Sequence, residues 1–158
     1  MSKIKQPNSK MCFVCGLENP IGLQLHIYQK EPGVIETTYT APDHFQGYPD
    51  VLHGGIVATL LDEMSGRAHM GDPSEPRFMF TGKIEVKYRK NVPLGIPLKI
   101  VGKAGKMNTR TAEGWAGIYH PDGSLLAEAT TLLFNVPDET LASTDLEELG
   151  WKVYPDEN

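Results

Sequence analysis

The sequence predicts a single α+β domain in which one long apolar helix is enclosed by a curved antiparallel β-sheet. Residues 54–70 have the apolar spacing of a buried helix, whereas the segments on either side alternate apolar and polar residues as strands do. A sheet must cover one apolar face, and the chain supplies only one long helix for that purpose. A sheet wrapped around that helix is therefore the economical arrangement.

The central helix follows a turn signal, His53-Gly54-Gly55, because adjacent glycines adopt backbone angles that side chains forbid. The apolar residues after it share the spacing of one wide buried face. They are Ile56, Val57, Leu60, Leu61 and Met64. The Gly-Asp-Pro sequence at 71–73 is a stop signal, so the helix is expected to end near Met70.

Strands are expected before and after the helix. Two precede it, at 23–28 and 34–39, and form an antiparallel hairpin; a loop rich in Pro, Gly and Asp at 41–50 leads into the helix. Longer strands follow the helix, separated by turn sequences. Their expected ranges are 78–89, 98–103, 109–119 and 125–136.

The domain organisation follows from length and local composition. A chain of 158 residues has the length of one domain, which we place at residues 11–137. Residues 1–10 form a polar arm that we expect to be mobile. Residues 138–158 form an acidic tail, in which three leucines at near-helical spacing predict a short peripheral helix. They are Leu141, Leu146 and Leu149.

The overall composition is that of a soluble globular protein, with 40% hydrophobic and 22% charged residues. No apolar run approaches the roughly 18 residues that a membrane-spanning helix needs. The polar N-terminus lacks the apolar core of a signal peptide, so a cytoplasmic location is expected. The net charge of -5 argues against general nucleic-acid binding.

Charge is uneven along the chain, and residues 86–110 contain basic side chains but no acidic ones. The basic residues are Lys87, Arg89, Lys90, Lys99, Lys103, Lys106 and Arg110. A basic segment in an acidic protein is a candidate site for a small anionic ligand. The alternative, which composition alone favours, is that these side chains are solvated strand faces and turns.

Cys12 and Cys15 form a C-x-x-C pair, which raises the question of a metal or redox site. Structural zinc needs four ligands, and the sequence has no second Cys pair or close His pair to complete the set. A redox pair is normally found at the start of a helix in a βαβ unit, and that pattern is absent downstream. We therefore expect a buried structural pair in a tight turn, and no metal.

The central helix also carries candidate catalytic groups. Asp62 lies in a largely apolar segment, where a carboxylate is costly unless it is paired or used. At the other end of the helix, the first backbone N–H groups are free and carry partial positive charge, which favours an oxygen that becomes negative. Glu63 is a rival to Asp62, but neighbouring helical residues point about 100° apart, so both cannot face one site.

Three stretches together resemble a known family. They are His53-Gly54-Gly55 with Asp62 nine positions after the histidine, Cys12-Phe13-Val14-Cys15-Gly16 with Asn19-Pro20-Ile21-Gly22-Leu23, and Val92-Pro93-Leu94-Gly95-Ile96-Pro97-Leu98. In this order they are similar to the acyl-CoA thioesterases of the hotdog fold, in the branch of the phenylacetate-pathway thioesterases. The resemblance covers residues 11–136. It implies a hotdog fold and hydrolysis of an acyl-CoA thioester by water, with no metal or redox cofactor and with coenzyme A only as part of the substrate.

The resemblance also implies site residues. The Gly54 N–H would bind the developing oxyanion, with Gly55 beside it and His53 hydrogen-bonded nearby. Asp62 would be the base or nucleophile, and Thr81 would hold the attacking water. Relatives often carry an Asn or Gln a few positions before the histidine, where it orients the carboxylate or the water. The position six before His53 is Gly47, so its neighbour Gln46 becomes the candidate for that role.

Helix geometry adds a constraint on this site. Gly54 and Asp62 are separated by roughly 12 Å along a helix axis, so they cannot contact one carbonyl group together. The two groups must then come from different chains, as in a twofold homodimer with antiparallel helices. This agrees with the family, whose sites lie across the dimer interface. Pairing of dimers into a homotetramer stays open.

Coenzyme A carries phosphates, which Arg pairs with bidentately. Arg89 and Lys90 are the expected contacts, and strand alternation would place only one of them on a given face. Two other functions of the same fold stay open: a non-catalytic acyl-CoA-binding protein, and an enoyl-CoA hydratase with an Asp/His pair at a different spacing. The sequence does not define the acyl group.

Overall fold

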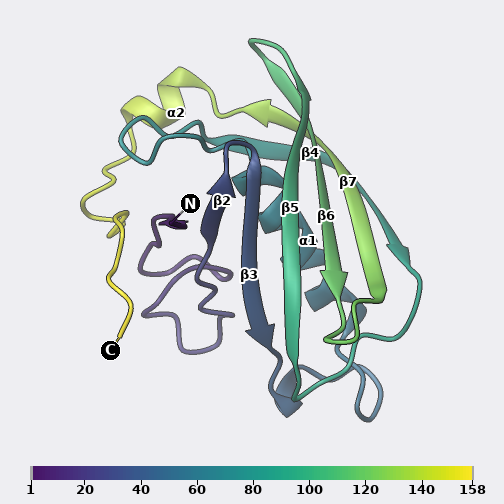
Figure 1. Cartoon of the computed structure of the whole chain (residues 1–158). Helices are drawn as coiled ribbons and strands as arrows, with labels where there is room; N and C mark the ends of the chain where they lie inside the picture. Colours follow the sequence, from purple (N-terminus) through teal and green to yellow (C-terminus); the bar gives the residue numbers. More distant parts are fainter. Residues whose placement is uncertain (1, 158) are drawn as a thin grey trace.

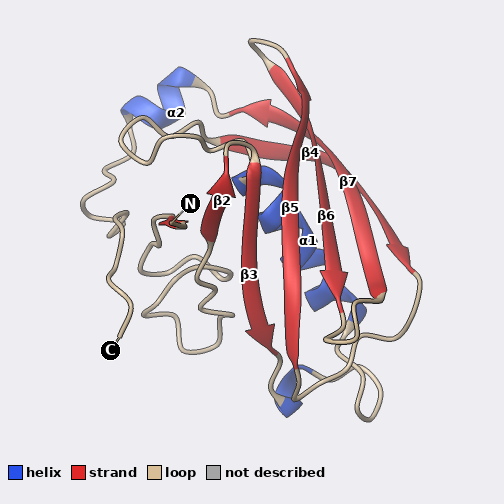
Figure 2. Ribbon diagram, in the orientation of Figure 1, coloured by secondary structure: helices blue, strands red, loops and turns tan. Residues whose placement is uncertain are grey.

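The computed structural model describes residues 2–157. A seven-stranded sheet with the order β1-β2-β3-β5-β6-β7-β4 curves around a single long helix, α1 (Figure 1, Figure 2). All pairings are antiparallel. The elements are β1 (Ile4–Lys5), β2 (Tyr28–Glu31), β3 (Val34–Thr40), the short 3-10 helix η1 (Asp43–Phe45), α1 (Gly54–Arg67), β4 (Met79–Tyr88), β5 (Pro97–Met107), β6 (Thr111–Tyr119), β7 (Leu125–Asn135) and α2 (Asp138–Ala142). The predicted α+β architecture is confirmed.

Helix α1 is the centre of the hydrophobic core, as its apolar spacing predicts. Val57, Leu60, Leu61 and Met64 are all buried, whereas Ile56 is only partly buried. The helix ends at Arg67, three residues before the predicted end, and Ala68 and His69 continue it only as a turn.

Two glycines of the sheet allow α1 to approach it closely. A Cβ atom on Gly102 of β5 would lie 2.1 Å from the Met64 carbonyl oxygen, and one on Gly114 of β6 would lie 2.8 Å from the Ser65 carbonyl oxygen. Any larger residue would push the helix away from the sheet. Ser65 also accepts a 3.0 Å hydrogen bond from Thr131 of β7. The position of the helix is therefore fixed by contacts with three consecutive strands.

The first predicted strand is largely wrong. Residues 23–27 do not pair with the sheet; the Leu23 and Leu25 N–H groups donate instead to the carbonyl oxygens of Phe13 and Val14, each at 2.8 Å. Leu23, Leu25 and Ile27 are buried, so the alternation of apolar and polar residues correctly indicated which side chains are buried but not that the segment pairs with the sheet. The other five predicted strands are present, and β5 continues to Met107, beyond the predicted range.

The N-terminal segment is packed, contrary to the prediction of a mobile arm. Gln6 and Asn8 are buried, and Asn8 donates from Nδ2 to the carbonyl oxygens of Cys15 and Leu25 at 2.8 and 2.9 Å. Asn8 also forms a β-bridge with Lys152, so the two ends of the chain lie together beside β2 (Figure 1). These polar contacts explain why a polar composition does not make the segment mobile.

The acidic tail contains the predicted short helix, α2, but of the three leucines only Leu141 belongs to it. Leu146 and Leu149 follow in turns. None of the helices in residues 2–157 has the length and apolarity that crossing a bilayer demands.

Candidate functional site

At the N-terminus of α1, one backbone N–H group is free to donate a hydrogen bond. The His53 side chain caps the helix, and its Nδ1 accepts a 2.9 Å hydrogen bond from the Gly55 N–H. The Gly54 N–H has no acceptor among residues 2–157. Gly55, predicted as a second donor, is therefore occupied by His53, and Gly54 alone is free to bind an oxyanion.

Tyr88, the last residue of β4, contacts the same helix end. Its hydroxyl donates a 2.6 Å hydrogen bond to the Gly54 carbonyl oxygen. The contact joins the edge strand of the sheet to the first turn of α1 and orients the Gly54–Gly55 peptide. Sequence reasoning missed Tyr88, because within an alternating strand it looks like any exposed aromatic residue.

A cavity of about 470 Å³ lies at this helix end, and His53, Gly54, Tyr88, Arg89 and Lys90 are among its lining residues. Arg89 and Lys90 both line it, contrary to the expectation from strand alternation. The reason is that β4 ends at Tyr88, so the strand period no longer applies to the two residues that follow.

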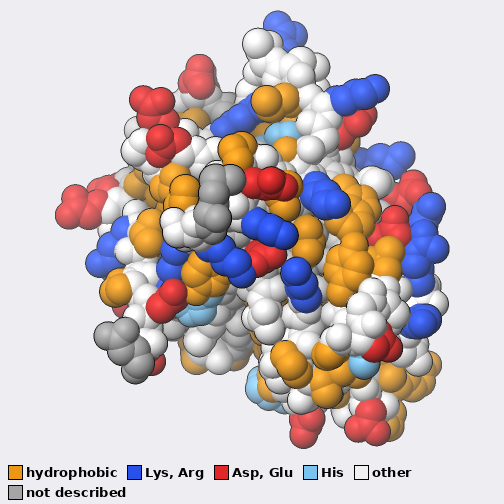
Figure 3. Space-filling model, viewed as in Figure 1, with side chains coloured by type: hydrophobic (Ala, Val, Ile, Leu, Met, Phe, Trp, Pro, Cys, Tyr) orange, Lys and Arg blue, Asp and Glu red, His pale blue; other side chains and the backbone are white. Residues whose placement is uncertain are grey.

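The basic residues differ in their partners. Arg89 forms a 2.6 Å ion pair from Nε to Glu128 Oε2, whereas Lys90 has no acidic partner among residues 2–157. On the face of the molecule shown in Figure 3, Lys and Arg side chains are interleaved with acidic and hydrophobic ones. Of the basic residues in the segment 86–110, Arg89 and Lys90 line the cavity that contains His53 and Gly54.

Gln46 is exposed and lies in the loop at the same end of the helix. It forms a β-bridge with Leu52 and precedes Gly47, which lines the cavity. Its side chain makes no hydrogen bond with Asp62 of its own chain. Gln46 thus lies in the loop next to His53, and its role toward the carboxylate of a second chain stays a prediction.

The structure brings Asp62 and Thr81 together in one chain. Thr81 Oγ1 donates a 2.6 Å hydrogen bond to Asp62 Oδ1. Burial raises the pKa of the Asp62 carboxyl above its ordinary value and the neighbouring Glu63 adds to this, while the Thr81 hydrogen bond opposes it. A carboxylate with a raised pKa is a stronger base than an exposed one. Thr81 is held in place on β4 just before the β-bulge at residues 81–83.

Asp62 and Thr81 line a second, larger cavity of about 570 Å³. Its walls come from α1, from β4, from the N-terminal loop and from the C-terminal segment. Apolar side chains from these segments include Met11, Phe78, Leu141, Leu146 and Leu149. A cavity of this kind fits an apolar group next to the carboxylate.

Glu63 has a partner of its own. Arg67 Nε donates to Glu63 Oε1 at 2.8 Å, one helical turn away. Arg67 is buried, donates from Nη1 to the Pro7 carbonyl oxygen at 2.8 Å, and lies 4.8 Å from the Trp151 ring. An ion-paired carboxylate is a poor base, so the geometry favours Asp62 over Glu63. No pattern in the sequence predicted this buried arginine.

The two cysteines are close together but differ in exposure. Cys15 is buried, as expected, whereas Cys12 is exposed. A hydrogen bond from the Cys12 thiol lowers the pKa of Cys15 to about 6, and nearby Arg67 contributes, while burial opposes them. The same bond raises the pKa of Cys12, which keeps its proton.

Within one chain, the carboxylate and the free N–H donor do not share a cavity. Asp62 and Thr81 line the larger cavity, whereas His53 and Gly54 line the smaller one. The chain therefore carries two half-sites at two positions along α1. This is the separation expected from the helix rise.

Comparisons with known proteins agree with this fold. No family model matches the chain. A solved thioesterase superfamily protein has 26% sequence identity and a TM-score of 0.71, over 78% of this chain and 59% of the other. The chain has the hotdog fold. The PaaI protein of the E. coli phenylacetic acid degradation operon shares the hotdog fold, with a TM-score of 0.65 at 15% identity over 73% of this chain and 81% of its own.

Curated relatives of this hotdog protein include acyl-coenzyme A thioesterase THEM4 from two species. The rat protein is 25% identical over 133 residues, covering 84% of this chain and 56% of its own length. The Xenopus laevis protein is 27% identical over 107 residues, covering 68% and 47%. The chain thus spans about half the length of the curated relatives it matches.

Proposed function

We propose that this hotdog protein is an acyl-CoA thioesterase that works as a dimer, with each site shared between two chains. The observation that carries the proposal is the separation of Asp62 from the Gly54 N–H into two cavities. Thioester hydrolysis needs both a base or nucleophile and an oxyanion donor at one carbonyl group. The names of the curated relatives support the same activity.

The chemistry divides between the two half-sites. Asp62 takes a proton from water, or attacks directly, and Thr81 keeps its carboxylate oriented. The carbonyl oxygen becomes negative and accepts from the Gly54 N–H at the helix N-terminus of the other chain. When Asp62 acts as a base, the carbon–sulfur bond then breaks, and the coenzyme A thiolate takes the proton from Asp62 as the free acid forms. When Asp62 attacks directly, the bond breaks to leave an anhydride between the acyl group and Asp62, which water hydrolyses to the free acid while supplying the proton for the thiolate.

The edge strand β4 supports a specific dimer. Among residues 2–157 it is the outer strand of the sheet and pairs only with β7, which leaves its second edge open. Thr81, beside Asp62, lies near its start, whereas Tyr88, beside Gly54, is its last residue. Antiparallel pairing of two β4 strands around a twofold axis would bring Thr81 of one chain toward Tyr88 of the other. The same pairing would join the two half-sites and bring Gln46 near the other chain's Asp62.

The two cavities divide the substrate between them. The smaller cavity, with Arg89 and Lys90, suits the phosphates of coenzyme A. The larger and mainly apolar cavity beside Asp62 suits the acyl group. Solved hotdog neighbours with acetyl-CoA or coenzyme A bound, from Streptococcus mutans and Streptococcus pneumoniae, agree with a coenzyme A ester as the substrate.

A panel of acyl-CoA esters, assayed for release of free thiol, tests the proposal. We expect turnover of at least one ester that depends on Asp62, and a dimer or larger assembly by light scattering. Tight binding of acyl-CoA without hydrolysis of any ester would favour the alternative, a non-catalytic acyl-CoA-binding protein. A purely monomeric protein with full activity would contradict the shared site.

A further inference from the structure

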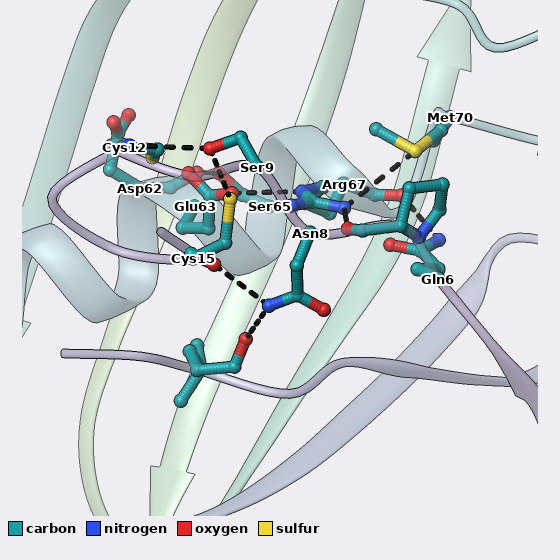
Figure 4. A network of polar contacts seen from close by, with 12 residues as sticks. Gln6, Asn8, Ser9, Cys12, Cys15, Asp62, Glu63, Ser65, Arg67 and Met70 are labelled. Carbon is teal, nitrogen blue, oxygen red and sulfur yellow. Dashed lines mark hydrogen bonds and ion pairs between the residues drawn. The ribbon is translucent and has the colours of Figure 1, made fainter. Parts of the chain in front are cut away.

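Three potential metal ligands meet outside the Asp62–Thr81 pair. The Sγ atoms of Cys12 and Cys15 and a carboxylate oxygen of Glu63 all lie within 4.8 Å of one another. Figure 4 shows them converging from two elements, the N-terminal loop and helix α1. In a tetrahedral zinc site, bonds of about 2.3 Å to sulfur and about 2.0–2.2 Å to oxygen place the ligand atoms under 4 Å apart. The three groups thus need only a small contraction to enclose an ion.

The loop that carries the cysteines is sterically fixed. A Cβ atom on Gly16 would lie 2.4 Å from the Cys12 carbonyl oxygen, so only glycine allows the turn to close. The Gly16 N–H donates to that oxygen at 2.7 Å. Ser9 Oγ accepts from the Cys12 N–H at 3.2 Å and lies 3.7 Å from Cys15 Sγ. These contacts present both sulfur atoms to Glu63 and supply the outer-shell bonds that orient metal ligands.

Charge and donor type favour a soft divalent cation here. Two thiolates and the Glu63 carboxylate would face one cation, Arg67, and a divalent ion would bring this cluster to neutrality. Arg67 occupies Glu63 Oε1, which leaves the second carboxylate oxygen for the metal. Thiolate pairs select zinc-like ions over magnesium or calcium.

We propose that Cys12, Cys15 and Glu63 form a three-ligand binding site for Zn²⁺ or a similarly thiophilic divalent ion. The same three residues line the larger cavity, so the fourth coordination position faces that space and is open to water or a small ligand. The spacing of the cysteines alone argued against a metal, because the third ligand comes from a helix residue far along the chain. The ion takes no part in the proposed hydrolysis, which uses Asp62 and Thr81.

Cobalt titration tests this site independently of enzyme activity. The full-length protein is reduced, desalted without oxygen and titrated with Co²⁺. We expect one equivalent to produce the near-ultraviolet thiolate-to-cobalt charge-transfer band and the intense visible absorption of tetrahedral cobalt, both abolished by Zn²⁺. Reduced protein that gives neither band overturns the proposal, and so does a cobalt spectrum typical of six oxygen ligands.

Variants identify the ligands. Cys12 is exposed, so Cys12→Ser should fold normally, which circular dichroism checks. We expect it to weaken Co²⁺ binding by more than the about 10–100-fold that loss of an outer-shell partner costs. Glu63→Gln should weaken binding while the charge-transfer band persists, whereas Glu18→Gln, an exposed carboxylate on the same loop, should leave binding unchanged. A folded Cys12→Ser protein with wild-type affinity would overturn the assignment.

Discussion

The hydroxyl of Thr81 donates a 2.6 Å hydrogen bond to the Asp62 carboxylate, which joins the edge strand β4 to the middle of helix α1. This bond opposes the effect of burial, which raises the pKa of the same carboxyl. Thr81 therefore controls both the direction and the basicity of the group that we propose activates water. Removal of the Thr81 hydroxyl should therefore change the pH dependence of kcat/KM.

Thr81→Val should shift the acidic limb of the kcat/KM profile to higher pH. The valine cannot stabilise the Asp62 carboxylate, so the pKa of Asp62 rises further and the active, ionised form is lost at a higher pH. Thr81→Ser keeps the hydroxyl and should keep the wild-type limb. If valine and serine variants share one profile, Thr81 acts only through packing.

Asp62→Asn should lower kcat by about 10²–10⁴-fold while the protein still folds and binds acyl-CoA. The reason is that Asn neither accepts a proton from water nor attacks a thioester. Steady-state kinetics and ligand titration measure the two effects separately. Asp138→Asn, which removes an exposed carboxylate, is the matched control. A variant that retains a third of wild-type kcat would remove Asp62 from the mechanism.

Two substitutions at Gly54 distinguish the effect of losing its N–H donor from the effect of adding a side chain. Gly54→Ala keeps the N–H, and its Cβ would meet the Tyr88 hydroxyl at an ordinary 3.5 Å, so we expect activity near wild type. Gly54→Pro deletes the donor at the first helical position, where proline is tolerated. Loss of an oxyanion donor should lower kcat by about 10²–10³-fold. Equal kinetics for the two variants would assign the oxyanion to another donor.

Lys90→Glu should raise KM for acyl-CoA much more than KM for a short acyl thioester without the nucleotide. The lysine lines the smaller cavity without an acidic partner, so it is available to a phosphate. Added salt should weaken the coenzyme A substrate selectively, because exposed charges are screened over about 8–10 Å. Lys106→Glu, on the exposed β5 end, is the control. An equal change for both substrates would mean that Lys90 is simply solvated.

Mixing two inactive variants tests the shared site directly. Asp62→Asn and Gly54→Pro chains, refolded together, form mixed dimers in which one site carries both lesions and the other carries none. Random mixing makes half of the dimers mixed with one intact site in two, so roughly a quarter of wild-type activity should return. Native mass spectrometry measures the mixed fraction. Mixed dimers without recovered activity would place the whole site within one chain.

Periodicity and turn residues were sufficient to predict most of the fold. Helix α1 and the strands from β3 onward follow from apolar spacing, because those elements bury one face against a single core. Residues 23–27 show the limit of the method. Their alternation of apolar and polar residues reflects burial against the N-terminal loop. Whether such a segment also pairs with a strand depends on residues far away in the sequence, and a local pattern contains no information on them.

The candidate site was only partly predictable for a similar reason. The proximity of Asp62 and Thr81 follows from the resemblance to a family, and the structure has both residues in contact. Tyr88 at Gly54 and Arg67 at Glu63 required knowledge of which strand and which chain end lie against α1. Single-sequence patterns carry no information on such long-range pairs.

Both ends of the chain meet at one buried side chain. Arg67 holds the Pro7 carbonyl oxygen and lies against the Trp151 ring, and the segments around these two residues form rims of the larger cavity. The walls around the proposed acyl group are thus built partly from the two chain ends, whereas the reacting groups belong to the helix and sheet. Substitutions in the tails would change substrate preference without disturbing hydrolysis, which gives the protein a route to evolve new specificities at little catalytic cost.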